Sequence, residues 1–497
     1  MVAWPAAWTV RRSRVAARRS AAVSAERRRM AGWLGLGLLI RLAVMPFAVT
    51  TDMLAVYWRA HLIAHDGRVF DSYLVNMGAH YVHAAALRVL GPLLPPPDAV
   101  WTDPWWWSDS FGLSPQVLRE FQAAPDVFQT LFVLKLPYLA ADLAAGAVLV
   151  ALVRAARPAL VRRAWAFWML SPIGIYASFL FGRYEAFPVL CVVLALLAVE
   201  RDRPWLGALA LGAGITMRGY PLLCVPLFAL IAVRGPLRQA AWAGAALAPF
   251  AAVMASNRLL AGTVGELATL RDAHTGTTFF AYTLPVDAIG QVSVFFLAAF
   301  ALYGALAARS FGWWGGGPVR PGELWIWLFA LHAAMFGLAT FSAHYLAWLT
   351  PFVALALARR PGWRGVGWLH AAQVVVVLAL ADVLGGPTVG VFSPLLPADV
   401  TLAAPLYELT LTSPDLAAQV AGLLRTGSVA LMALLAWPAV AEIARDSGAR
   451  HSSAGDSGAR HSSARDSGAR DSGARHSSAG DSGARELGVP QPAQRTA

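Results

Sequence analysis

Three very short turns place polar side chains between long apolar runs of this 497-residue sequence. They read FGRYE (181–185), MRGYP (217–221) and FSAHY (341–345). Arginine suits bidentate contacts to phosphate, so Arg183 and Arg218 together indicate a site for an anionic lipid head group. A single arginine at a helix end is more often a snorkelling anchor. The same turns supply four further candidate binding residues, Glu185, Tyr220, His344 and Tyr345.

Asp52 lies just after the first apolar run, where a carboxylate can act as the general base that deprotonates an attacking hydroxyl. The alternative interpretation is a solvated N-cap, because Thr51-Asp52 precedes a helical stretch. Three carboxylates in the same segment are rival candidates, Asp66, Asp71 and Asp109.

Lys135 and Asp142 are seven residues apart in an apolar stretch, so they share one face of a helix. Ionisable groups at membrane depth are costly, and they should therefore face the protein interior or a polar cavity. Two interpretations stay open. The residues hold helices in register, or Lys135 binds phosphate as a point charge.

The composition identifies the elements that must position these residues. Hydrophobic residues make up 58% of the chain and charged residues 14%, which excludes a water-soluble enzyme, a disordered protein and a fibrous repeat. The net charge of +12 is typical of arginine-rich loops in a membrane protein, so no nucleic-acid partner is expected. The two cysteines, Cys191 and Cys224, lie in apolar runs and predict no disulfide and no zinc site.

The apolar runs predict an all-α polytopic membrane protein with about 12 transmembrane helices (10–14). The first helix is expected at 31–49. The others are expected near 127–153, 164–181, 186–200, 205–217, 220–233, 239–259, 290–308, 323–340, 345–358, 366–385 and 419–441.

Alternate connections between these runs are rich in arginine, at 154–163, 200–203, 234–238, 309–320 and 359–364. The positive-inside rule places these connections, and both chain ends, in the cytoplasm of a multi-pass protein of the cell (plasma) membrane. The candidate residues lie in the other connections, and the candidate site is therefore predicted to be extracytoplasmic.

Three regions are expected. Residues 1–30 form a basic cytoplasmic N-terminus, 31–445 a transmembrane domain, and 446–497 a disordered cytoplasmic tail of DSGAR and HSSA repeats. Within the domain, the first extracytoplasmic segment (50–126) holds two amphipathic stretches that are predicted to lie along the membrane surface. The chain carries no HExxH motif, no GxSxG motif and no glycine-rich nucleotide loop. We expect no metal site and no cofactor, although a divalent metal is not excluded.

Five segments, in this order, resemble the GT-C superfamily of integral membrane glycosyltransferases. The similarity is greatest to bacterial mannosyltransferase-like enzymes that depend on polyprenyl-phosphate sugars. The segments are TDMLAVYWRAHLIAHDG (51–67), LKLPYLAADLAA (134–145), SPIGIYASFLFGRYEAF (171–187), GAGITMRGYPLLCVP (212–226) and FSAHYLAWLTP (341–351). Arg183 and Glu185 stand where that pattern has Gln and Asp, and Arg218 stands where it has Lys.

The resemblance implies transfer of a sugar, with mannose the commonest in the family, from a polyprenyl-phosphate donor to a hydroxyl of a glycan, lipid or protein acceptor. It implies an inverting reaction outside the cytoplasm with Asp52 as general base. Arg218, then Lys135, would stabilise the leaving phosphate.

Two other classes remain open on the sequence. About twelve helices with both ends inside is also a layout of multi-pass transporters and lipid flippases, although we find no inverted repeat. The third class is a non-catalytic membrane scaffold, with the repeat tail as its interaction arm.

Overall fold

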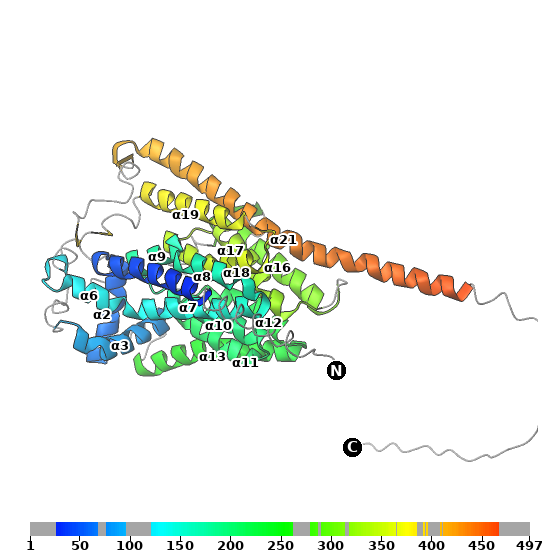
Figure 1. Cartoon of the computed structure of the whole chain (residues 1–497), viewed down its shortest axis with the longest axis horizontal. Helices are drawn as coiled ribbons and strands as arrows, with labels where there is room; N and C mark the ends of the chain where they lie inside the picture. Colours follow the sequence, from blue (N-terminus) through cyan, green and yellow to red (C-terminus); the bar gives the residue numbers. More distant parts are fainter. Residues whose placement is uncertain are drawn as a thin grey trace, which may run out of the picture. The chain divides into compact units, whose positions relative to one another are not determined.

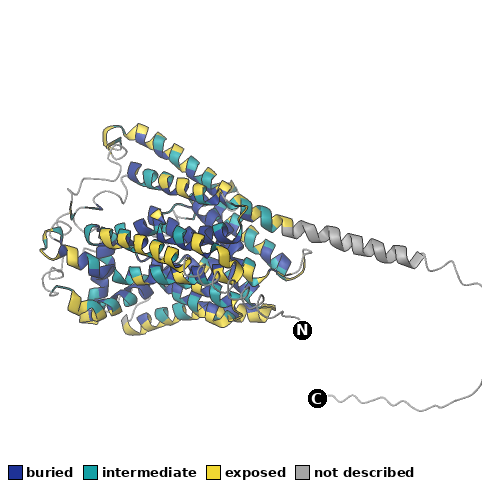
Figure 2. Ribbon diagram, viewed as in Figure 1, coloured by how far each residue is buried: buried dark blue, intermediate teal, exposed yellow. Residues whose placement is uncertain are grey.

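The computed structural model describes residues 26–67, 76–95, 121–261, 279–286, 290–313, 318–363, 365–384, 391–392, 394–395, 408–409 and 411–466. The chain divides into two units, Met1–Ser447 and Gly448–Ala497. The first unit is a bundle of helices whose buried residues gather inside it (Figures 1 and 2). Its described strands, β1 (Thr283–Val286) and β2 (Gly290–Ser293), form one antiparallel hairpin in which Thr283 pairs with Ser293.

Six helical stretches of the described chain are long and apolar enough to cross a membrane. They are Glu26–Phe47, Val127–Ala156, Pro236–Leu260, Pro321–Leu338, Val366–Val383 and Pro414–Arg445. Four more apolar helices are shorter: α10 (Ala186–Glu200), α11 (Pro204–Met217), α12 (Pro221–Ala232) and α16 (Val294–Ser310). The structure is therefore that of a helical membrane protein, and the count of about twelve spans stays a prediction.

Two of the expected spans are broken helices. The run expected at 127–153 forms α6 (Val127–Leu134) and α7 (Leu136–Ala156), which meet at Lys135. Pro137 accounts for the break, because a proline ring blocks the helical carbonyl four residues before it. The run expected at 164–181 forms α8 (Val161–Met169), α9 (Pro172–Ile175) and a five-residue π-helix, η6 (Tyr176–Leu180).

The break after α8 brings the 181–185 turn against the helix that carries Asp52. Two residues after the π-helix lies Gly182, whose φ of 72° is a left-handed conformation that glycine adopts without strain. A Cβ at Gly182 would lie 2.7 Å from Sδ of Met53, so the turn approaches that helix too closely for a side chain.

Helices α10, α11 and α12 lie side by side, and α11 runs antiparallel to the other two (Figure 1). They contain 15, 14 and 12 residues, which corresponds to lengths of about 18–22 Å at 1.5 Å per residue. The neighbouring α13 (Pro236–Ala261) is 26 residues long. Further helices of the described C-terminal half are α17 (Leu324–Leu338), the 3₁₀ helix η9 (Ala343–Leu349), α18 (Thr350–Arg359), α19 (Val366–Val383) and α21 (Pro414–Asp466).

The described part of the expected extracytoplasmic segment includes two α-helices at one end of the bundle, α2 (Thr51–Asp66) and α3 (Met77–Leu90) (Figure 1). They pack on each other and share an apolar core with α6. α2 buries most of its side chains, so it is not the half-exposed helix that the sequence indicated. Whether either helix touches the membrane surface stays a prediction.

Several sequence predictions concern residues outside the described ranges, among them Asp71, Asp109 and most of the tail. Helix α21 continues to Asp466 and so includes the first repeats of the 446–497 segment. The disorder of that segment and the basic N-terminal region stay predictions.

Candidate functional site

The start of α2 fixes Asp52 at the edge of the bundle. Thr50 caps this helix: its Oγ1 accepts a hydrogen bond from the Met53 amide (3.4 Å) and donates one to the Phe181 carbonyl (2.6 Å). Asp52 is therefore in the first turn and is not the capping residue. Its side chain is 48% exposed. A carboxylate that is not used by the helix end is available to a ligand.

Arg183 joins Asp52 to the 181–185 turn. Its Nε lies 3.6 Å from Oδ2 of Asp52, and its Nη1 donates a 3.4 Å hydrogen bond to the Asp52 carbonyl. The Arg183 side chain is only 12% exposed, yet its Nε has no hydrogen-bond partner among the described residues. The guanidinium thus holds Asp52 in place and keeps a donor unused.

Glu185 and Arg218 form a buried ion pair. Oε1 of Glu185 accepts hydrogen bonds from Nε (3.1 Å) and Nη2 (2.6 Å) of Arg218. Oε2 of the same carboxylate accepts a 2.6 Å bond from Nε1 of Trp348, in η9. The Glu185 side chain is fully buried, so these contacts fix the direction of the guanidinium and leave its Nη1 unbonded within the described part of the chain.

Aromatic rings separate and support the two guanidiniums. The Tyr184 ring lies 5.2 Å from Cζ of Arg183 and 4.6 Å from Cζ of Arg218, which are cation–π distances. Tyr345 contacts Arg218 at 5.1 Å and stacks on Trp348, whose other stacking partner is Tyr220. The three turns singled out in the sequence therefore meet in one cluster.

His344 lies beside this cluster and is stacked on Phe181 with ring centroids 4.4 Å apart. Its Nε2 is 3.8 Å from Oε1 of Glu185, which is too long for a hydrogen bond, and neither ring nitrogen has a hydrogen-bond partner among the described residues. Burial, and then the charges of Arg183 and Arg218, hold the pKa of His344 well below its usual value. The ring is therefore neutral near pH 7 and can donate one hydrogen bond and accept another.

Sequence reasoning missed a second polar layer on α2 and α3. Arg59 Nη1 lies 3.5 Å from Nε2 of His80, and both side chains are buried. Burial and nearby cations, Arg59 first among them, hold the pKa of His80 well below its usual value. Arg59 follows Asp52 by seven residues, two helical turns later, and this spacing was a signal available in the sequence.

Three other candidates do not join the cluster. Nζ of Lys135 donates hydrogen bonds to the carbonyls of Met45 (2.9 Å), Phe179 (2.9 Å) and Ala48, and its side chain is fully buried. The Lys135 ammonium therefore links the segment before α2 to the π-helix, and its three bonds leave it no donor for a phosphate.

Asp142 pairs with Arg41 at 2.9 Å inside the bundle, not with Lys135. Asp66 is exposed at the far end of α2, about 21 Å along the helix from Asp52. The structural interpretation of Lys135 and Asp142 is therefore the one that the contacts support, and Asp66 is separated from the other candidates.

The arginine-rich connections lie together at the other end of α10. Arg359 donates to both oxygens of Glu200 (2.7 and 2.8 Å), and also to the carbonyl of Leu152 (2.7 Å). The alternation of connections in the sequence thus corresponds to two ends of one bundle. Among the described residues, no group of three His, Cys, Asp or Glu side chains is arranged to hold a metal ion.

Glu185, Arg183 and Arg218 all lie in a part of the chain whose sequence matches a known protein family. Residues 123–264 match the model of Glycosyltransferase family 87. This is a GT-C-type membrane glycosyltransferase family, so the resemblance to GT-C membrane glycosyltransferases is confirmed over these residues. No curated protein and no solved structure matches the chain.

The match and the apolar helices support a membrane glycosyltransferase. The matched residues include Arg183, Glu185 and Arg218, but neither Asp52 nor His344. The match gives no support to the transporter or flippase alternative.

Proposed function

We propose that this protein transfers a sugar, mannose in the first instance, from a polyprenyl-phosphate donor to an acceptor hydroxyl on the extracytoplasmic face. The reaction takes place at the cluster of Asp52, Arg183 and Arg218. A glycan, lipid or protein supplies the hydroxyl, and the reaction inverts the anomeric centre.

The unpartnered polar atoms of the cluster carry this proposal. Nε of Arg183, Oη of Tyr184 and both ring nitrogens of His344 are buried, and none has a hydrogen-bond partner among the described residues. Buried polar atoms are ordinarily paired, so a group of unpaired ones calls for a ligand or water. Most of these atoms can donate, and they lie beside the guanidiniums of Arg183 and Arg218, whose own counter-charges are Asp52 and Glu185. The unused donors favour an anion such as a phosphate.

The reaction assigns a separate role to each charged group. Asp52 accepts the proton of the acceptor hydroxyl as the oxygen attacks the anomeric carbon. The bond between that carbon and the phosphate oxygen breaks, and the leaving phosphate takes the electron pair. Nη1 of Arg218 and Nε of Arg183 stabilise the charge that develops on it. Glu185 touches neither substrate and positions Arg218.

The first test replaces the proposed base. In membranes supplied with labelled polyprenyl-phosphate mannose and an acceptor extract, Asp52→Asn should reduce transfer by about 10²- to 10⁴-fold, the usual contribution of a general base. Asp66→Asn is the matched control, since it removes a carboxylate from the same helix outside the cluster, and it should leave transfer unchanged. Near-normal transfer by Asp52→Asn would remove Asp52 from the base role.

If wild-type membranes leave the labelled mannose lipid unconsumed, a panel of other polyprenyl-phosphate sugars identifies the donor. Consumption of none of them would contradict the lipid-phosphate donor while leaving the glycosyltransferase family unaffected.

A further inference from the structure

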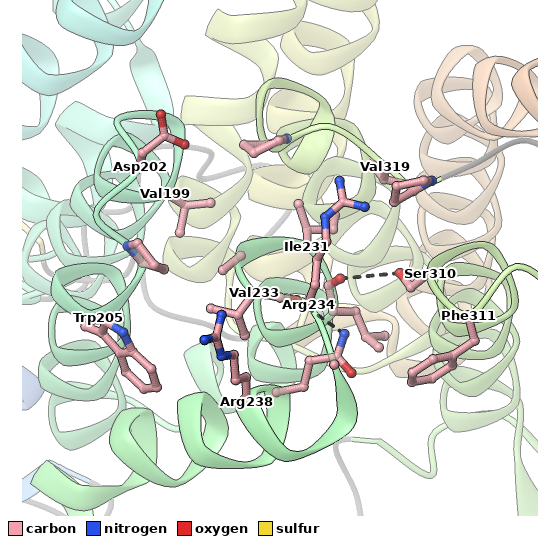
Figure 3. Close-up of a pocket in the computed structure, with 17 residues that line it drawn as sticks. Val199, Asp202, Trp205, Ile231, Val233, Arg234, Arg238, Ser310, Phe311 and Val319 are labelled. Carbon is pink, nitrogen blue, oxygen red and sulfur yellow. Dashed lines mark hydrogen bonds between the residues drawn. The ribbon is translucent and has the colours of Figure 1, made fainter. Parts of the chain in front are cut away.

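A large cavity lies at the opposite end of helices α10, α11 and α12 from the Glu185–Arg218 pair. It has a volume of about 800 Å³ and opens where α10 and α12 end and α11 and α13 begin (Figure 3). Residues of the loop after α16 close another side. The volume lies within the range of about 300–1,000 Å³ that small-molecule sites occupy.

Two arginines project into this cavity, one from the turn before α13 and one from the first turn of α13. Arg234 and Arg238 are four residues apart, both are exposed, and Figure 3 shows both side chains extending into the hollow. Neither has a carboxylate within 4 Å among the described residues. The first turn of the 26-residue α13 adds partial positive charge at the same place. Asp202 is the one carboxylate among the lining residues.

Apolar and aromatic side chains line the rest of the cavity. Leu230, Ile231 and Val233 form part of its wall, and Trp205 and Phe311 flank it on opposite sides (Figure 3). Both aromatic side chains are partly exposed, Trp205 by 48%. Tryptophan is enriched where a protein meets lipid head groups. The cavity therefore offers cations and an apolar surface side by side, which suits an amphiphile with an anionic head.

We infer that this cavity binds the phosphate-bearing head group of an anionic membrane lipid. The guanidiniums of Arg234 and Arg238 hold the phosphate, and the acyl chains follow the apolar wall. Arginine is suited to this contact because its planar donors match phosphate oxygens in pairs. The site is separate from the proposed transfer site and does not depend on the transfer reaction.

Lipid titration of the delipidated, detergent-solubilised full chain tests the inference. Native mass spectrometry with phosphatidylglycerol should show a tightest-bound lipid, and phosphatidylcholine should bind at least tenfold more weakly. The double variant Arg234→Gln/Arg238→Gln should weaken the tightest phosphatidylglycerol binding at least tenfold. Without lipid it should melt at the wild-type temperature, because both side chains are exposed.

The matched control is Arg162→Gln/Arg163→Gln, which removes two exposed arginines from another arginine-rich connection. This control should bind phosphatidylglycerol as the wild type does. Equal losses in the two double variants, or no loss in the first, would overturn the site. Displacement of the lipid by an equal concentration of inorganic phosphate would show a site for free anions and overturn the lipid assignment. A photoactivatable phosphatidylglycerol that labels no peptide within 199–239 or 310–321 would also overturn it.

Discussion

Arg218 at one end of the α10–α12 helices, and Arg234 and Arg238 at the other, stand in contrasting surroundings. At one end Arg218 is buried, bonded twice to Glu185 and supported by tyrosine rings. At the other end Arg234 and Arg238 stand exposed in an open cavity. A fixed guanidinium presents a chosen nitrogen to a reacting group, whereas an exposed one adapts to whichever head group approaches. The surroundings of the arginine, more than its presence, therefore separate a candidate reaction centre from a candidate lipid site.

The largest effect is expected from removing the counter-charge of a buried arginine, compared with that of a partly exposed one. The two pairs are Glu185–Arg218 and Glu442–Arg360. Glu185→Gln should lower the free energy of unfolding by about 3–5 kcal/mol and abolish most transfer, because it leaves the buried Arg218 without its counter-charge. Thermal unfolding in detergent and transfer from labelled donor lipid measure the two effects.

Glu442→Gln is the control at the opposite end. Glu442 pairs with Arg360, but the two side chains are 19% and 34% exposed, and solvent screens such a pair. The loss should be about 1 kcal/mol or less, with transfer unchanged. Equal destabilisation by the two variants would contradict the contrast between a buried and a partly exposed arginine pair.

Lys135→Met separates a structural from a substrate-binding lysine. Loss of the ammonium leaves three carbonyls without their charged donor, so we expect a destabilisation of about 3 kcal/mol in thermal unfolding. At a temperature where the variant is folded, its KM for the donor lipid should stay within about twofold of wild type. A variant of normal stability with a strongly raised donor KM would instead restore the phosphate role for Lys135. Arg162→Met, at an exposed position, controls for the loss of a cation.

The buried histidines beside the candidate site predict a dependence on pH with a smaller effect. Burial lowers the pKa of His83 to about 4, from an ordinary 6.5. The unfolded chain therefore binds a proton at this residue that the folded one does not, and stability is lost as the pH falls from 6.5 towards 4. The full effect amounts to about 3 kcal/mol.

Melting temperatures measured between pH 7 and pH 4 check this expectation. His83→Gln should flatten the decline while keeping polar atoms for the Tyr138 hydroxyl and the Ala79 carbonyl, which His83 contacts. An unchanged slope in that variant would remove His83 as its source.

The sequence predicted that the polar residues of three short turns would gather at one end of the helices, because polar residues are conspicuous between apolar runs. Arg183, Glu185, Arg218, His344 and Tyr345 meet as the alternation of connections indicated. Their pairing was not predictable, since it depends on the direction in which each turn leaves its helix. Only the structure shows that Glu185 positions Arg218.

Other features depended on tertiary packing that a linear pattern does not contain. The runs at 127–153 and 164–181 are apolar throughout, so each was predicted as one helix. The helix breaks at Lys135 and near Ser171 were nevertheless indicated by Pro137 and Pro172. The amphipathic pattern of α2 indicated a half-exposed helix, but most of its side chains are buried because α2 shares an apolar core with α3 and α6. The 800 Å³ cavity exists only because several helices end at one level.

The shortness of α10, α11 and α12 bears on how a donor lipid reaches the enzyme. A hydrocarbon layer is about 30 Å thick, whereas these helices are about 18–22 Å long. If the cavity end sits at the level of one leaflet's head groups, Arg218 lies about 10 Å beneath the opposite surface. On the proposed function, the polyprenyl chain of the donor would then remain in the hydrocarbon layer while its phosphate contacts Arg218, and the acceptor would have to enter the layer to reach the sugar. Such a sunken reaction centre favours attack by the acceptor over attack by bulk water.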